Sequence, residues 1–179
     1  MRIVVPAVPG MLKPETLPAI LASGWHVDVV PMLGLESYFE LMGRLWGRAE
    51  TFAIVEQDIL VGPDSLIQLF TCSEPWCAFS YEVFAGDVAT AYGHVGALGC
   101  ARFRRSMMIE HPEAVLEAGK MDLHPVHPPR SYAVMDATLS RWLQACGYRP
   151  HQHLPNVEHL HHYNRADAYV PPAVASPHG

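Results

Sequence analysis

Two carboxylates placed close together offer the clearest chemistry in this sequence. Glu56 and Asp58 flank Gln57 directly after the apolar run FAIV at residues 52–55. That short run favours a buried strand, and the segment VGPDS after it favours a turn and a helix start. Mg²⁺ and Mn²⁺ take one or two protein carboxylates and fill their other positions with water and substrate phosphates. The pair therefore suggests a divalent metal site, unless Glu56 is only an exposed edge residue and Asp58 only orders the turn.

The segments before this strand alternate between strand and helix patterns. Residues 2–5 and 26–31 favour strands, whereas residues 15–22 and 35–46 carry apolar side chains at helical spacing. Such an alternation predicts right-handed crossovers and a parallel sheet. We therefore expect an α/β fold with a mostly parallel central sheet flanked by helices. Ligands of such sheets bind beyond the carboxyl ends of the strands, which is where Glu56 would lie.

The second half of the chain has fewer periodic segments. Its clearest helix covers residues 136–146, with Gly147 as the C-terminal stop. Residues 86–99 and 120–131 favour loops, and the second of these is a candidate lid. The other predicted elements are a helix at 64–70 capped by Asp64-Ser65, strands at 76–84 and 100–103, and helices at 104–110 and 113–118.

Composition excludes several classes of protein. The chain has 179 residues, half of them apolar, a formal charge of −6 and no basic cluster. This length suits a single domain, and the charge argues against nucleic acid as the main partner. No run reaches transmembrane length, and the N-terminus does not resemble a secretion signal. These features predict a soluble cytoplasmic protein.

Four cysteines and a histidine-rich segment complete the set of reactive side chains. Cys72, Cys77, Cys100 and Cys146 form no C-x-x-C pair and lie in apolar contexts, which predicts four reduced, buried thiols. A zinc site formed by Cys72, Cys77 and histidines is an alternative, although the spacing is not that of the common zinc motifs. Five of the 11 histidines fall between His151 and His162.

The order of the motifs resembles that of the GT-A glycosyltransferases, a group of nucleotide-sugar-dependent enzymes that includes the large family 2. The segment IVVPAVPG resembles the family's opening strand and nucleotide-binding loop, and Glu56-Gln57-Asp58 resembles its D-x-D metal motif. GALGCARFRRSMM resembles its glycine-containing strand followed by an Arg-bearing helix start that shapes the donor and acceptor pocket. Met135-Asp136 before ATLSRWLQACGY resembles its x-E-D motif. The metal motif comes about one strand–helix unit early, so the resemblance is to a truncated, minimal form.

The resemblance implies a role for each matching residue. Pro6, Ala7, Val8, Glu56 and Gly99 would bind the nucleotide sugar. The metal, Mn²⁺ or Mg²⁺, would be held by Glu56, Asp58 and His159, with His161 as a substitute for His159. Asp136 would be the catalytic base. This is the full set of candidate site residues.

The implied reaction is the transfer of a sugar from a nucleoside-diphosphate sugar to an acceptor hydroxyl. The metal would stabilise the departing diphosphate, and Asp136 would take the acceptor proton in a direct, inverting displacement. Asp136 as a simple helix cap and His159 as a solvated histidine remain alternatives.

Two other functions remain open from the sequence. One is a metal-dependent phosphoesterase or nucleotidyltransferase, and the other is a non-catalytic nucleotide-sugar-binding relative. The resemblance to the GT-A glycosyltransferases implies a nucleotide-sugar-binding catalytic domain at residues 1–163, followed by a proline-rich tail at residues 164–179. The tail also suggests a homodimer contact.

Overall fold

The protein is built around a six-stranded sheet that separates two layers of helices. The computed structural model describes residues 2–62, 64–85, 88–92, 98–122, 127–153, 157–160 and 162–163. The sheet has the strand order β2-β1-β3-β8-β5-β9. Its strands are β1 (Arg2–Ala7), β2 (His26–Pro31), β3 (Phe52–Val55), β5 (Trp76–Phe79), β8 (Cys100–Phe103) and β9 (His151–His153).

Most of this sheet is parallel, as its alternating sequence pattern predicts. β1 pairs in parallel with β2 and β3, and β5 pairs in parallel with β9. Only β8 runs the other way, because it is antiparallel to both β3 and β5. The strands β3 and β5 therefore end at the same edge of the sheet, and β8 begins there.

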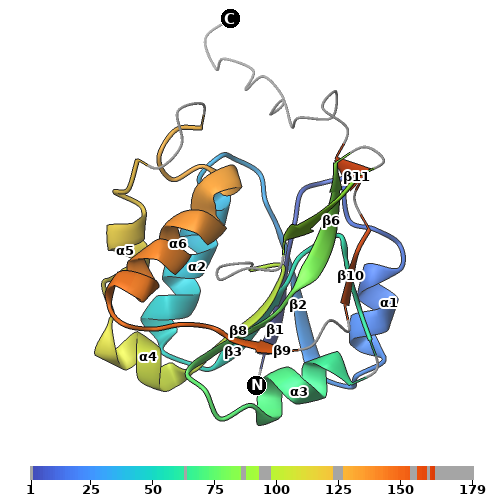
Figure 1. Ribbon diagram of the computed structural model, residues 1–179, viewed down its shortest axis with the longest axis horizontal. Coiled ribbons are helices and arrows are strands. Elements are labelled where there is room, and N and C mark those ends of the chain that lie inside the picture. The colour runs from blue at the N-terminus through green and yellow to red at the C-terminus, as the bar shows by residue number, and fades with distance from the viewer. Residues whose placement is uncertain are drawn as a thin grey trace, which may run out of the picture.

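The helices cover both faces of the sheet (Figure 1). The helices α2, α5 and α6 lie on one face, and α1 and α3 lie on the other. The described helices are α1 (Thr16–Leu21), α2 (Ser37–Arg48), α3 (Ser65–Thr71), α4 (Arg105–Glu110), α5 (Ala114–Ala118) and α6 (Met135–Ala145), with a short 3₁₀ helix at Tyr132–Val134.

Alternation along the strands produces two cores. Phe52 and Ile54 of β3 pack with the aromatic side chains of α2, whereas Ala53 and Val55 face α1 and α3. Successive side chains of a strand point to opposite faces, so a strand buried on both sides must be apolar throughout. That is why FAIV contains no polar residue.

The helix predicted at residues 136–146 is confirmed with a shift of one residue. α6 covers Met135–Ala145, and Gly147 follows as the predicted stop, with φ of +93°. The Gly147 N–H donates to the Gln144 carbonyl, and the Tyr148 N–H donates to the Leu143 carbonyl, each at 3.0 Å. This pair of bonds forms a Schellman ending, which favours glycine because the backbone is left-handed there.

Several predicted boundaries were wrong. The strand expected at residues 76–84 divides at Ser80 into β5 and β6 (Tyr81–Ala85), because β6 leaves the central sheet to pair with β7 (Val88–Tyr92). β7 lies inside the region expected to be a loop. Asp64 makes no side-chain cap; instead the Gly62 N–H donates to the Ser65 hydroxyl at 3.0 Å.

Two short ladders lie outside the central sheet. β4 (Ile59–Val61) pairs antiparallel with β10 (Val157–His159), and β11 (His162–Tyr163) pairs in parallel with β6. β4 was not predicted, and only its last residue, Val61, falls in the segment expected to form a turn. Residues 123–126 of the candidate lid and the tail at 164–179 lie outside the described residues. None of the helices in the described ranges has the length and apolar character needed to cross a membrane.

Candidate active site

Glu56 and Asp58 lie in the turn that follows β3, at the carboxyl end of the parallel strands. The Glu56 N–H donates to the Gly99 carbonyl at 2.8 Å, and the Ile59 N–H donates to the Glu56 carbonyl at 3.1 Å. The first bond ties the turn to the start of β8, and the second closes the turn before β4. The backbone thus holds Glu56 and Asp58 at the edge where α/β sheets bind their ligands.

Glu56 is half-buried and shares its surroundings with other acids. The Tyr38 hydroxyl donates to Glu56 Oε1 at 3.0 Å. Burial raises the pKa of Glu56 to about 8, the negative charges of Asp58 and Asp136 add to this rise, and the Tyr38 hydrogen bond opposes it. Burial and the Glu56 charge also raise the pKa of Tyr38. The site therefore gathers carboxyl groups in a partly buried environment, and a bound cation would favour their ionised forms.

Asp136 approaches this cluster from the first turn of α6. Its Oδ1 atom accepts a hydrogen bond from the Ala137 N–H at 2.7 Å. The N-cap position belongs to Val134, so Asp136 stabilises the first turn without being the N-cap itself. Burial raises its pKa, while the nearby backbone N–H groups lower it. The fold thus brings Asp136 into electrostatic contact with Glu56, although the two are far apart in sequence.

Asp58 and His159 are brought together by the β4–β10 ladder. The ladder pairs His159 with Ile59, and the Leu160 N–H donates to the Asp58 carbonyl at 2.7 Å. His159 Nε2 then lies 3.5 Å from Asp58 Oδ2, with both side chains buried. The His159 ring also stacks on Tyr81, with centroids 5.3 Å apart and planes 8° apart. The imidazole is therefore held in place from two sides.

Gln57 fastens the opening loop of the chain to the acidic turn. Its Oε1 atom accepts from the Val8 N–H at 2.6 Å, and its carbonyl accepts from the Lys13 N–H at 2.9 Å. Of the three residues predicted to bind the nucleotide sugar here, Pro6 and Ala7 are buried in β1, and only Val8 lies in the loop. The predicted loop and the predicted metal motif are thus in direct contact.

A cavity of about 340 Å³ opens between this loop and the acidic turn. Residues 10–14 form one wall, and Gln57 and Asp58 form the other. Lys13 and the buried Asp58 are thus both among the residues that line the cavity. A cationic and an anionic residue at one cavity suit a group that carries negative charge and brings a divalent cation.

Gly99 lies where no larger residue fits without displacement. A Cβ atom added at this position would lie 2.3 Å from the Tyr81 hydroxyl oxygen. Because Tyr81 also stacks on His159, the missing side chain at Gly99 lets the aromatic ring reach the histidine. This gives Gly99 a structural role at the site in addition to its carbonyl bond with Glu56.

Three residues of the site were missed from the sequence: Tyr38, Gln57 and Tyr81. Tyr38 and Tyr81 occur in apolar patterns, so only their hydroxyl groups hinted at polar contacts. Gln57 lies between the two carboxylates but carries no charge. His161, the substitute predicted for His159, lies outside the described residues.

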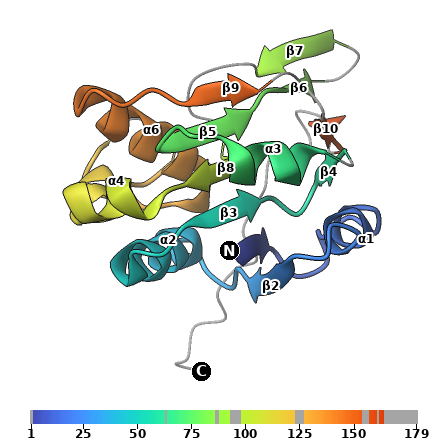
Figure 2. The same cartoon turned by 90° about the horizontal axis from the view of Figure 1, so that it is seen from below.

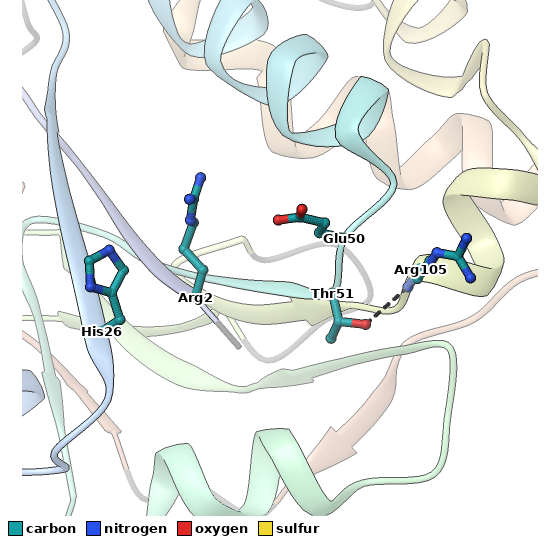
Figure 3. Close-up of a pocket in the computed structure, with 5 residues that line it drawn as sticks. All are labelled: Arg2, His26, Glu50, Thr51 and Arg105. Carbon is teal, nitrogen blue, oxygen red and sulfur yellow. Dashed lines mark hydrogen bonds between the residues drawn. The ribbon is translucent and has the colours of Figure 1, made fainter.

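A larger hollow of about 440 Å³ lies at the opposite edge of the sheet (Figure 3). It is lined by Arg2, His26, Glu50, Thr51 and Arg105, and the Arg105 N–H donates to the Thr51 hydroxyl at 3.1 Å. This edge carries the amino ends of the parallel strands, where α/β sheets do not usually bind ligands.

The Arg-bearing helix start was expected to help shape the donor and acceptor pocket, and it lies at this opposite edge instead. The reason is the direction of β8. The strand begins beside Glu56 with Cys100 opposite Val55, and it ends with Phe103 opposite Phe52. Arg104 and Arg105 follow the far end of β8, whereas Gly99 precedes its near end. The glycine of the motif thus reaches the site, and these two arginines do not.

Comparisons with known proteins give a fold but no family. No family model matches the chain, and no curated protein matches it in sequence. One solved structure, a glycosyltransferase involved in the glycosylation of the major capsid of PBCV-1, has a TM-score of 0.55 at 13% identity. The match covers 92% of this chain and 94% of that chain. A197 from STIV has a TM-score of 0.44 at 11% identity, with 87% and 82% covered. The chain thus has a glycosyltransferase-like α/β fold along most of its length.

Proposed function

We propose that this protein is a metal-dependent glycosyltransferase of minimal GT-A type, which moves a sugar from a nucleoside-diphosphate sugar to an acceptor hydroxyl. The observation that carries the proposal is the convergence of Glu56, Asp58, Asp136 and His159 at the carboxyl edge of the sheet. These residues come from three separate parts of the chain. The similarity in fold to the PBCV-1 glycosyltransferase supports the same conclusion.

The side chains around Asp58 fit a Mn²⁺ or Mg²⁺ ion. Both ions accept carboxylate ligands, and Mn²⁺ also accepts imidazole, so Asp58 and His159 are the proposed direct ligands. Glu56 lies in the same acidic cluster, where it would act through a bound water or through the sugar nucleotide. The ion, when bound, supplies a Lewis acid that neutralises the charge developing on the diphosphate.

The donor diphosphate is proposed to occupy the cavity between residues 10–14 and Asp58. Lys13 is a cationic residue among those that line this cavity, and Gln57 fixes the loop backbone by accepting from the Val8 N–H. A preorganised loop of this kind loses little freedom when a ligand binds, so more of the binding energy is retained. Gly10, with φ of +82°, lets the loop turn without a side chain over the cavity.

Asp136 is the proposed general base. In this step the acceptor oxygen bonds to the anomeric carbon, the bond from that carbon to the diphosphate oxygen breaks, and the acceptor proton passes to the Asp136 carboxylate. The nucleoside diphosphate leaves with the bonding electron pair. Because the displacement is direct, it inverts the configuration at the anomeric carbon.

Incubation with a panel of nucleoside-diphosphate sugars and Mn²⁺ tests the proposal, with release of free nucleoside diphosphate as the readout. A glycosyltransferase releases it from some donors, faster with a suitable acceptor, and a chelator stops the release. Release of a nucleoside monophosphate or of inorganic phosphate instead would identify a phosphoesterase or nucleotidyltransferase. Binding without turnover for every donor and acceptor would identify a non-catalytic binder. Each of these two results would overturn the proposal.

A further inference from the structure

Four side chains with sulfur or imidazole nitrogen atoms meet at the β9 edge of the sheet, away from the acidic cluster. Cys72 follows α3, Cys77 lies in β5, and His151 and His153 lie in β9. Figure 2 shows β9 beside β5, at the end of the sheet opposite β2. We call these four residues the Cys/His cluster.

Three of the four residues already have ligand atoms close enough together for one metal ion, and the fourth, His151, contacts Cys72. The sulfur atoms of Cys72 and Cys77 and a ring nitrogen of His153 all lie within 4.8 Å of one another. Cys72 Sγ also lies 3.2 Å from His151 Nδ1. The rings of His151 and His153 are 4.8 Å apart between centroids. In the part of the chain that the structure describes, this is the one place where three such ligand atoms gather so closely.

The strand register explains why these residues meet. β5 and β9 are parallel, with Cys77 opposite His151 and Phe79 opposite His153. Alternate residues of a strand share one face, so both histidines lie on the face that carries Cys77. α3 covers that face and ends at Thr71, which places Cys72 above the same point. Secondary structure thus fixes all four positions.

We propose that the Cys/His cluster binds one Zn²⁺ ion that joins α3, β5 and β9. Two thiolates and two imidazoles form a ligand set typical of closed, four-coordinate structural zinc sites. Soft sulfur ligands also distinguish this cluster from the carboxylate-rich site at Asp58, which suits Mg²⁺ or Mn²⁺. The proposed ion would stabilise the end of the sheet, and it takes no part in the proposed sugar transfer.

The surroundings of the cluster support a sulfur-bound cation. Arg102 is buried beneath it and donates from Nη2 to Cys77 Sγ at 3.1 Å, while its Nε donates to the Leu69 carbonyl at 2.9 Å. Such N–H···S bonds stabilise thiolate ligands from outside the coordination sphere. A divalent ion with two thiolates has no net charge, so the guanidinium faces a neutral centre. His153 Nε2 is buried and has no hydrogen-bond partner among the described residues.

Titration of the reduced, metal-free protein with Co²⁺ tests this proposal directly. Co²⁺ replaces Zn²⁺ in tetrahedral sites and gives visible bands together with a thiolate-to-metal charge-transfer band in the near ultraviolet. We expect both at one equivalent of Co²⁺ and their loss when one equivalent of Zn²⁺ is added. Cys72→Ser should weaken Zn²⁺ binding by more than about 100-fold, because even the loss of an outer-shell partner costs about 10–100-fold.

Two further variants keep the test decisive. Cys146 was predicted to be buried, but it follows the last residue of α6 and is exposed. Cys146→Ser should therefore leave the Co²⁺ spectrum unchanged. His151→Gln changes an exposed side chain of β9, so the fold should persist while the Co²⁺ affinity falls. The proposal is overturned if the charge-transfer band is absent, if it survives Cys72→Ser, or if non-reducing mass spectrometry of the protein as purified shows a Cys72–Cys77 disulfide.

One variant separates this proposal from the proposed function. Asp58→Ala removes a side chain of the acidic site and should leave the Co²⁺–thiolate band intact. If that band disappears together with Mn²⁺-dependent nucleotide binding, the two sites are not independent and the zinc proposal fails. Conversely, a protein that shows the band but transfers no sugar would retain the zinc site and lose only the proposed function.

Discussion

The carboxyl edge and the β9 edge of the central sheet offer opposite kinds of ligand atoms. At the carboxyl edge, Glu56, Asp58 and Asp136 provide oxygen atoms, with one imidazole from His159. At the β9 edge, Cys72 and Cys77 provide sulfur atoms, with imidazoles from His151 and His153. The first set has an adjoining cavity, whereas the second lies between α3 and a buried arginine, with His151 exposed at its outer side.

This difference shows how one sheet can separate a reactive site from a structural one. Carboxylates around an open cavity leave coordination positions for a substrate and its phosphates. A closed cluster of four protein ligands leaves none, which is typical of structural zinc. If the two edges are independent, a variant at one edge should not change metal binding at the other. The following predictions test this separation.

The largest expected effect is that of Asp136→Asn on turnover. Loss of a general base typically lowers the rate by about 10²–10⁴-fold. The asparagine keeps an oxygen for the Ala137 N–H, so only the favourable interaction of the charge with the helix dipole is lost, about 0.3–1 kcal/mol. Rate measurements with saturating donor, together with thermal unfolding, check this prediction. A variant that transfers sugar at the original rate would leave Asp136 with a helix-stabilising role alone.

Asp58→Ala should have the next largest effect, on metal-dependent binding of nucleoside diphosphate. We expect the affinity measured by calorimetry with Mn²⁺ to fall by at least about 10–100-fold, since a direct ligand matters no less than an outer-shell partner. Asp64→Ala is a matched control, because Asp64 is exposed and makes no side-chain cap. Undiminished binding that a chelator does not affect would remove the metal from the proposed site.

Gly99→Ala should have a moderate effect on stability and a local effect on the site. The added methyl group would overlap the Tyr81 hydroxyl, and overpacking of this kind typically costs about 1–3 kcal/mol. Tyr81→Phe with Gly99→Ala should recover part of this loss, because the closest atom in the clash is then absent. Denaturant unfolding of the single and double variants measures the coupling. Equal destabilisation by Gly99→Ala with and without the hydroxyl would contradict the predicted clash.

The smallest effect concerns the pH dependence of stability in the presence of a chelator. The pKa of Glu56 is raised from 4.5 to about 8 in the folded protein. Between these values the folded state retains a proton that the unfolded chain releases, so stability should fall as the pH rises from about 4.5 to about 8. Glu56→Gln should flatten this part of the melting-temperature profile. An unchanged slope in the variant would assign the pH dependence to other groups.

Much of the fold was predictable because its strands are strongly patterned. The strands at His26–Pro31, Phe52–Val55 and Cys100–Phe103 have the predicted bounds, since each is a short run with clear breaks on both sides. β4 and β9 were missed because each has only three residues and forms through pairing with a distant strand. Such pairing depends on tertiary contacts that no local pattern encodes.

The candidate site was only partly predictable for the same reason. Glu56, Asp58 and Asp136 were chosen from local motifs, and the fold places them close enough to influence one another. The contact between Gln57 and Val8 and the stack of Tyr81 on His159 join segments that are distant in sequence. Arg102 was not predicted to be a core residue, since an arginine is rarely buried, yet its guanidinium is buried and donates to the Leu69 and Cys72 carbonyls.

The late position of β9 in the sequence has a consequence for biosynthesis. β9 completes the sheet by pairing with β5, and residues 80–150 lie between the two strands. The ribosome releases the N-terminal part of the chain first. β5 therefore has no β9 strand to pair with until His151–His153 have been synthesised, after β8 and the helices that follow it. Closing so long a loop is also a slow, entropically costly step. The edge of β5 is therefore the segment of the nascent chain most exposed to mispairing, until β9 arrives to cover it.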